Sequence, residues 1–147
     1  MIAAAPAGHQ TTGQHRAWAT LGIRTLFLGF LFSAPMVYAS AWPTTPADFA
    51  TLPPYCKARL KPSSETETQV WSQRLGTGFL HVHHYCAALH TEKLCFRAKT
   101  SADRKACLRD AIKEIEYVED HASPDFILRK QMAAKKRQMM STINLAP

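Results

Sequence analysis

The stretch that decides the fold is residues 79–98, which read FLHVHHYCAALHTEKLCFRA. Four of its residues recur at spacings of three, four and three, namely Phe79, Val82, Cys86 and Leu89. Such spacing places the four side chains on one face of an α-helix. We therefore predict a helix from about Phe79 to Ala98.

A second helix is predicted close behind it, over about Ala102–His121, with Ser101 as its cap. Its apolar stripe consists of Leu108, Ala111, Ile112, Ile115, Val118 and Ala122. Three side chains face outward: Lys113, Glu114 and Glu116. Because the connection over Lys99–Ser101 is short, the two helices are expected to lie antiparallel as a hairpin.

Two further helices cover the remaining apolar edge of the hairpin. The first is predicted over Glu65–Leu75, where Ser64 and Glu67 make a capping box and Gly76 ends the helix. Its buried edge consists of Val70, Trp71 and Leu75. The last helix is predicted to start at Ser123-Pro124-Asp125, to carry Phe126, Ile127, Leu128 and Met132, and to continue into Lys135-Lys136-Arg137. No strand-like alternation of useful length occurs, so the predicted fold class is all-α.

The first forty residues have the features of a secretory signal. Arg24 precedes a short apolar run over residues 26–32, and Ala39-Ser40-Ala41 is a small-residue cleavage site. The run is shorter than the roughly 20 apolar residues of a transmembrane helix. We predict cleavage after Ala41, no stable membrane span in the mature chain, and a periplasmic or secreted protein. The alternative is an uncleaved anchor over Leu21–Ala41.

Length and composition are those of one ordinary domain. The chain has 147 residues, 46% of them hydrophobic, and a formal net charge of +7, which excludes collagen-like, low-complexity and multi-span membrane proteins. The predicted organisation is a signal peptide over 1–41, a Pro-rich extended lead-in over 42–62, a helical domain over 63–141 and a tail over 142–147. A mature domain of this size has a thin core, so cross-links would stabilise it.

The four cysteines, Cys56, Cys86, Cys95 and Cys107, all follow the predicted cleavage site. An even number in an exported chain indicates two disulfides. Cys86 and Cys95 lie nine residues apart on one helix, on opposite sides and roughly 13 Å apart along its axis, so they cannot pair. We expect Cys95–Cys107 across the hairpin and Cys56–Cys86 between the lead-in and the helix. One bridge, Cys56–Cys86, with two buried thiols is the alternative.

The histidine cluster is the densest group of reactive side chains in the chain. His83, Cys86 and His90 share one helix face, and with Cys56 they would form a two-Cys, two-His site for zinc or copper. The same sulfurs cannot both bind a metal and form a disulfide, and the disulfide is favoured in an exported protein. We therefore expect no cofactor and structural histidines, with the metal site as the alternative.

No catalytic motif is present. The sequence lacks a haem-attachment motif, a nucleophile elbow and a phosphate-binding glycine loop, so no enzyme activity is expected. The acidic residues Glu114, Glu116, Glu119 and Asp120 are expected to form a solvated face. The basic residues Arg129, Lys130, Lys135, Lys136 and Arg137 are expected to form a solvated, fraying helix end, with no nucleic-acid partner.

Several motifs resemble a group of uncharacterised exported bacterial proteins. They are Pro53-Pro54-Tyr55-Cys56, Phe79-x-His81-x-His83-His84-Tyr85-Cys86-Ala87, Ala111-x-x-x-Ile115-x-Tyr117-Val118 and Pro124-x-Phe126. In that group tetratricopeptide-type repeats follow, and the resemblance implies a tetratricopeptide-like helical hairpin that contacts other proteins.

From these features we expect an exported helical scaffold that binds an envelope protein, with self-association also plausible for a single hairpin. The alternative function is a small periplasmic metal-binding or redox protein that uses the His/Cys cluster. Thiol titration with elemental analysis would separate the two.

Overall fold

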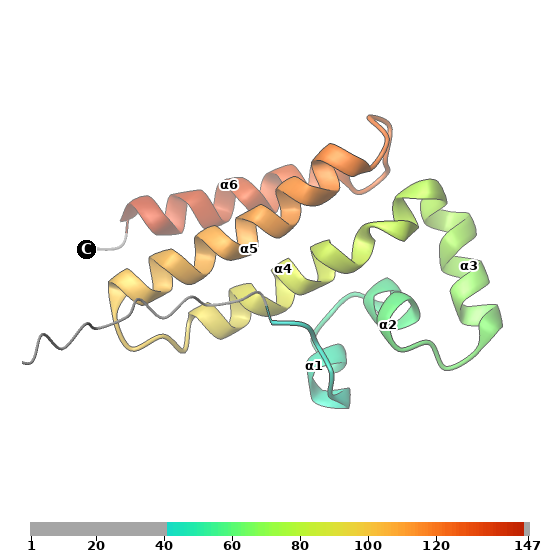
Figure 1. The fold of residues 1–147 in the computed structure, drawn as a ribbon, viewed down its shortest axis with the longest axis horizontal. Helices are drawn as coiled ribbons and strands as arrows, with labels where there is room; N and C mark the ends of the chain where they lie inside the picture. Colours follow the sequence, from blue (N-terminus) through green and yellow to red (C-terminus); the bar gives the residue numbers. More distant parts are fainter. Residues whose placement is uncertain (1–40, 146–147) are drawn as a thin grey trace, which may run out of the picture. The chain divides into compact units, whose positions relative to one another are not determined.

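The computed structural model describes residues 41–145, and this part of the chain is helical with no strand (Figure 1). The all-α prediction is confirmed for it. No helix in the described range combines the length and the apolar character needed to cross a membrane. The predicted signal peptide and its alternative, an anchor, fall almost entirely outside the described residues.

The Pro-rich lead-in is not extended throughout, as predicted, but contains two short helices, α1 (Pro46–Ala50) and α2 (Pro54–Leu60). Each begins with proline at its first position, where the missing N–H removes no hydrogen bond. The α1 helix is also capped: the Asp48 N–H donates to Thr45 Oγ1 (3.2 Å), and the Thr45 N–H donates to the Asp48 carboxylate (2.8 Å). This reciprocal pair stabilises a five-residue helix that proline content alone does not predict.

The α3 helix (Glu65–Leu75) has the predicted bounds. The Glu67 N–H donates to Ser64 Oγ (3.1 Å), and Gly76 ends the helix with a φ of 59°. The Glu67 carboxylate accepts from the Ser63 N–H (2.7 Å) instead of the Ser64 N–H, so the predicted capping box is shifted by one residue. Of the predicted buried edge, Leu75 is buried and Trp71 partly buried, whereas Val70 is exposed.

The central hairpin consists of α4 (Val82–Cys95) and α5 (Ser101–His121), which pack against each other along their length (Figure 1). The first residues of the predicted helix instead form the 3-10 helix η1 (Gly76–Leu80). Thr100, not Ser101, caps α5, since Thr100 Oγ1 accepts from the Asp103 N–H (3.0 Å). The predicted stripes of both helices are buried.

The last helix, α6 (Arg129–Leu145), packs along α5 and starts later than predicted. Residues 123–128 form turns that bury Phe126 and leave Ile127 exposed. The Arg129 guanidinium donates to the carbonyls of Glu119 (3.0 Å), Ala122 (2.8 Å) and Ser123 (3.1 Å) and thereby holds these turns at the C-terminal end of α5. The helix also continues to Leu145, through most of the predicted tail.

The acidic face of α5 and the basic face of α6 pair with each other, which corrects the prediction of two solvated charge runs. Lys136 Nζ lies 3.0 Å from Glu116 and 2.9 Å from Glu119, and Lys135 Nζ lies 3.1 Å from Glu92 on α4. Met132 and Met139 of α6 are fully buried in the same core as the hairpin. The α6 helix is therefore part of the domain core and not a fraying end.

Two disulfides connect these elements, and the described residues contain no free cysteine. Cys95–Cys107 joins α4 to α5 next to the hairpin turn, and Cys56–Cys86 joins α2 to α4. Both expected pairings are confirmed, and the alternative of two buried thiols is not observed. In a chain-entropy description, loops of 12 and 30 residues each stabilise the fold by about 3–4 kcal/mol.

Candidate functional site

The structure does not bring the four predicted metal ligands, Cys56, Cys86, His83 and His90, together. Cys56 and Cys86 are fully buried and bonded to each other, with 5.5 Å between their Cα atoms, so neither offers a thiolate. His83 and His90 lie two turns apart on α4, which separates them by about 10 Å along the helix axis. Within residues 41–145, no group of three or more His, Cys, Asp and Glu side chains is arranged to hold a metal ion.

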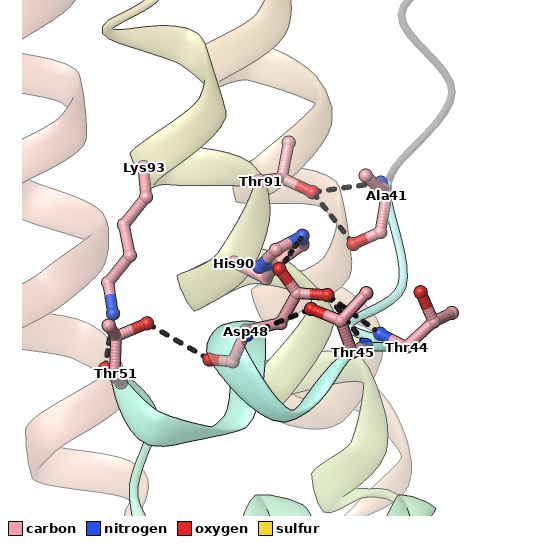
Figure 2. A network of polar contacts seen from close by, with 8 residues as sticks. All are labelled: Ala41, Thr44, Thr45, Asp48, Thr51, His90, Thr91 and Lys93. Carbon is pink, nitrogen blue, oxygen red and sulfur yellow. Dashed lines mark hydrogen bonds and ion pairs between the residues drawn. The ribbon is translucent and has the colours of Figure 1, made fainter.

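His90 instead belongs to a polar network that holds the start of the domain against α4 (Figure 2). Its Nε2 lies 3.9 Å from Asp48 Oδ1. The Asp48 carboxylate accepts from the backbone N–H groups of Thr45 and Thr44, and these bonds lower its pKa to about 2. The Ala41 N–H donates to Thr91 Oγ1 (3.0 Å). His90 is thus a buried structural histidine.

The other histidines of the predicted cluster form a different site, which we call the imidazole stripe. It consists of Trp42, His81, His83, His84, Tyr117 and His121. The Tyr117 ring centroid lies 3.7 Å from that of His84 and 3.9 Å from that of His121. Trp42 stacks on His83 at 5.5 Å. The stripe therefore joins the start of α4, the end of α5 and the residue that follows the predicted cleavage site.

Trp42, Tyr117 and His121 were not predicted as members of this site. A signal was available, because His81 and His84 are three residues apart and Tyr117 and His121 are four apart, so each pair shares a helix face. The two pairs meet only because α4 and α5 are antiparallel. The start of α4 then lies beside the end of α5.

Hydrogen bonds orient two imidazoles of the stripe. His84 Nδ1 lies 2.5 Å from the Glu114 carboxylate. The Nδ1–H of His121 donates to the carbonyl of Tyr117 at 2.7 Å, which leaves Nε2 as its free nitrogen when the ring is neutral. Glu114 is therefore a partner of a histidine, and not only a solvated acid as predicted.

The remaining two imidazoles are held neutral at pH 7. Burial, followed by the charges of His84 and Arg59, lowers the pKa of His83 to about 4, and its Nδ1 is buried without a hydrogen-bond partner. Burial also lowers the pKa of His81, with smaller contributions from His121 and His84. His81 and His83 are thus uncharged near neutral pH and resist protonation.

The α5–α6 groove is a second candidate site, with a volume of about 430 Å³. Its lining residues are Arg109, Ile112, Lys113, Glu116, Met140, Ile143 and Asn144. Those on α5 recur at spacings of three, one and three, so they form a continuous strip along the helix. Met140 is 42% exposed, and Ile143 is partly buried.

The charges around the α5–α6 groove are predominantly positive. Lys113 pairs with Asp110 (2.7 Å). Arg109 and, one turn before Met140, Arg137 are exposed and form no ion pair with any described residue. The groove therefore offers an apolar floor with unneutralised guanidinium groups beside it.

Searches against protein-family models, curated proteins and solved structures found no match to this chain.

Proposed function

We propose that this protein is an exported, disulfide-stabilised helical scaffold that binds another protein of the bacterial envelope through the α5–α6 groove. The observation that carries the proposal is the groove itself: its apolar floor consists of Ile112, Met140 and Ile143, and the exposed Arg109 and Arg137 beside it form no ion pair with any described residue. Apolar surface of this kind on an otherwise compact domain is typical of protein interaction sites.

The chemistry of the groove defines the partner. The apolar floor of the groove, formed by Ile112, Met140 and Ile143, would accept the apolar face of an amphipathic helix. Carboxylates beside that face would meet the guanidinium groups of Arg109 and Arg137, which bind carboxylates in a bidentate manner. We therefore expect the partner to present an acidic amphipathic helix.

The two disulfides support the exported location. Disulfides persist in oxidising compartments such as the periplasm and are rare in the bacterial cytoplasm. The resemblance to exported bacterial proteins with tetratricopeptide-like hairpins points in the same direction, because such hairpins serve as scaffolds for protein contacts.

The alternative function, metal binding or redox chemistry, has less support. All four sulfurs are nearly or fully buried, with at most 3% exposure for their residues. Thiol–disulfide exchange requires direct attack of a thiolate on a sulfur atom, so burial favours a structural role for both bridges.

Site-specific photo-crosslinking in intact cells tests the proposal. A photoreactive residue at Met140 should give a discrete adduct with a second protein, and the double variant Arg109→Glu/Arg137→Glu should reduce its yield several-fold. The control position is Gln69, which is exposed on α3. Equal adducts from both positions, or none from Met140, would contradict the proposal, and an adduct of twice the chain's mass would assign the groove to a second copy.

A further inference from the structure

Ala41, the first described residue, is hydrogen-bonded to the domain through its backbone. Its N–H donates to Thr91 Oγ1 on α4 (3.0 Å), and its carbonyl accepts from the same hydroxyl at 3.5 Å (Figure 2). A single threonine side chain thus pairs with both polar backbone groups of Ala41. The fold therefore uses Ala41 as a contact residue.

The Thr91 hydroxyl depends on Ala41 for its hydrogen bonds. Thr91 is 2% exposed, and within the described part of the chain both hydrogen bonds of its hydroxyl go to Ala41. A buried hydroxyl that loses its partners is destabilising. A mature chain that started at Trp42 would leave this hydroxyl without the two partners that it has in the structure.

The two residues after Ala41 are also held by the domain. The Trp42 ring stacks on that of His83 and meets that of His84 edge-on, with 5.5 Å between the centroids in both cases. Pro43 is buried. Proteases cleave most readily where the backbone is exposed and not hydrogen-bonded. The bond between Ala41 and Trp42 is therefore a poor substrate once the domain has folded.

Cleavage after Ala41 would also create an ammonium group on Trp42, at the imidazole stripe. Burial, and then the charges of His84 and Arg59, already lower the pKa of His83. The carboxylate of Glu114 is bonded to His84 and so is not available to a new cation. An ammonium group two residues earlier in the chain would lie farther from these groups along the backbone.

The sequence contains a second cleavage motif two residues upstream of the one predicted. Val37-Tyr38-Ala39 has a small apolar side chain at its first and third positions, as Ala39-Ser40-Ala41 does. Cleavage after Ala39 would leave Ser40 and Ala41 on the mature chain. The contact between Ala41 and Thr91 then persists.

We propose that the signal peptide is removed at the bond between Ala39 and Ser40, and that the mature protein keeps Ala41 as the residue that docks on Thr91. This inference rests on the proposed export. The reaction is hydrolysis by a signal-peptide-cleaving protease. Water adds its hydroxyl to the Ala39 carbonyl and its hydrogen to the Ser40 nitrogen, so the leader ends in a carboxylate and the mature chain begins with an ammonium group.

N-terminal sequencing of the exported protein tests the cleavage site. The expected start is Ser40-Ala41-Trp42. Ala41→Leu should leave this start unchanged, whereas Ala39→Leu should abolish it, because a large side chain blocks the position before the cleaved bond. A start at Trp42, or loss of processing in Ala41→Leu, would overturn the proposed site while leaving export intact. A full-length chain in the cytoplasm would overturn the proposed export as well.

Urea denaturation tests the role of Ala41 in the fold. The oxidised chains 40–147 and 42–147 are compared with and without Thr91→Val. The unfolding equilibrium constant of the shorter chain should be at least about fivefold larger than that of the longer one, as expected for a buried hydroxyl that loses its partners. Thr91→Val should remove this difference, because both chains then lack the hydroxyl. Equal stability of the two chains with Thr91 in place would overturn the docking role of Ala41.

Discussion

Gly78 has no side chain, and this allows two distant parts of the chain to come into contact. It lies in η1, and a Cβ atom there would overlap the ring of Phe126 from the turns before α6. Its φ is not positive, so backbone strain is not the reason for glycine at this position. The close approach of the Phe126 ring is the reason.

Gly78→Ala should therefore destabilise the protein by about 1–3 kcal/mol, as overpacking does in a dense core. Urea denaturation measures this change in the free energy of unfolding. The same substitution in a Phe126→Ala background should be much less destabilising, because the overlapping ring is absent. Equal destabilisation in the two backgrounds would show that the contact is unimportant.

His83 gives a prediction for the dependence of stability on pH. Its pKa is lowered from 6.5 to about 4 in the folded protein, first by burial. Between these values the unfolded chain binds the proton and the folded protein does not, so the free energy of unfolding should fall as the pH decreases from 6.5 towards 4. His83→Phe should flatten this slope, measured by urea denaturation at pH 7 and pH 4.5. Part of the slope should remain, because the pKa of His81 is also lowered. An unchanged slope would contradict the lowered pKa of His83 in the folded protein.

At the scale of elements, the two disulfides stabilise different connections. Cys95–Cys107 closes a 12-residue loop at the hairpin turn, and Cys56–Cys86 closes a 30-residue loop that attaches α2 to α4. Helices α4 and α5 share a long buried stripe, whereas α2 is a single short helix. The longer bridge therefore constrains the element that has less packing of its own.

Replacing both cysteines of a bridge by alanine tests this difference. Cys95→Ala/Cys107→Ala should lower the free energy of unfolding by about 3 kcal/mol, and Cys56→Ala/Cys86→Ala by about 4 kcal/mol. Only the second variant should expose the bonds after Lys57 and Arg59, both in α2, to rapid trypsin cleavage under native conditions. Rapid cleavage at these sites in the first variant as well would mean that the hairpin bridge also holds α2.

At the scale of the whole molecule, the proposed export predicts a specific mass. The polypeptide recovered from the periplasm or medium should have the mass of residues 40–147, four hydrogens lighter than its reduced form because of two disulfides. Intact-mass spectrometry before and after reduction measures both quantities. Recovery of the unprocessed, reduced chain from the cytoplasm would contradict the proposed export.

The sequence by itself determined α3, the central part of the α4–α5 hairpin and the favoured cysteine pairing, but not α1, α2 or the start of α6. Their signals are local: a cap at Ser64, a stop at Gly76, apolar spacing on α4 and α5, and a short turn that places Cys95 near Cys107. Each depends on residues within a few turns of one another, so helix geometry is sufficient to derive it.

Only the tertiary structure decided which side chains meet across helices. His84 meets Tyr117, Lys136 meets Glu119, and Phe126 meets Gly78. These contacts depend on the relative rotation and offset of packed helices, which the burial of whole apolar faces fixes and local spacing does not. Most of the alternative His/Cys metal set shares one helix face in the sequence, but in the fold Cys56 and Cys86 are bonded to each other, whereas the imidazole stripe and the α5–α6 groove arise from packing.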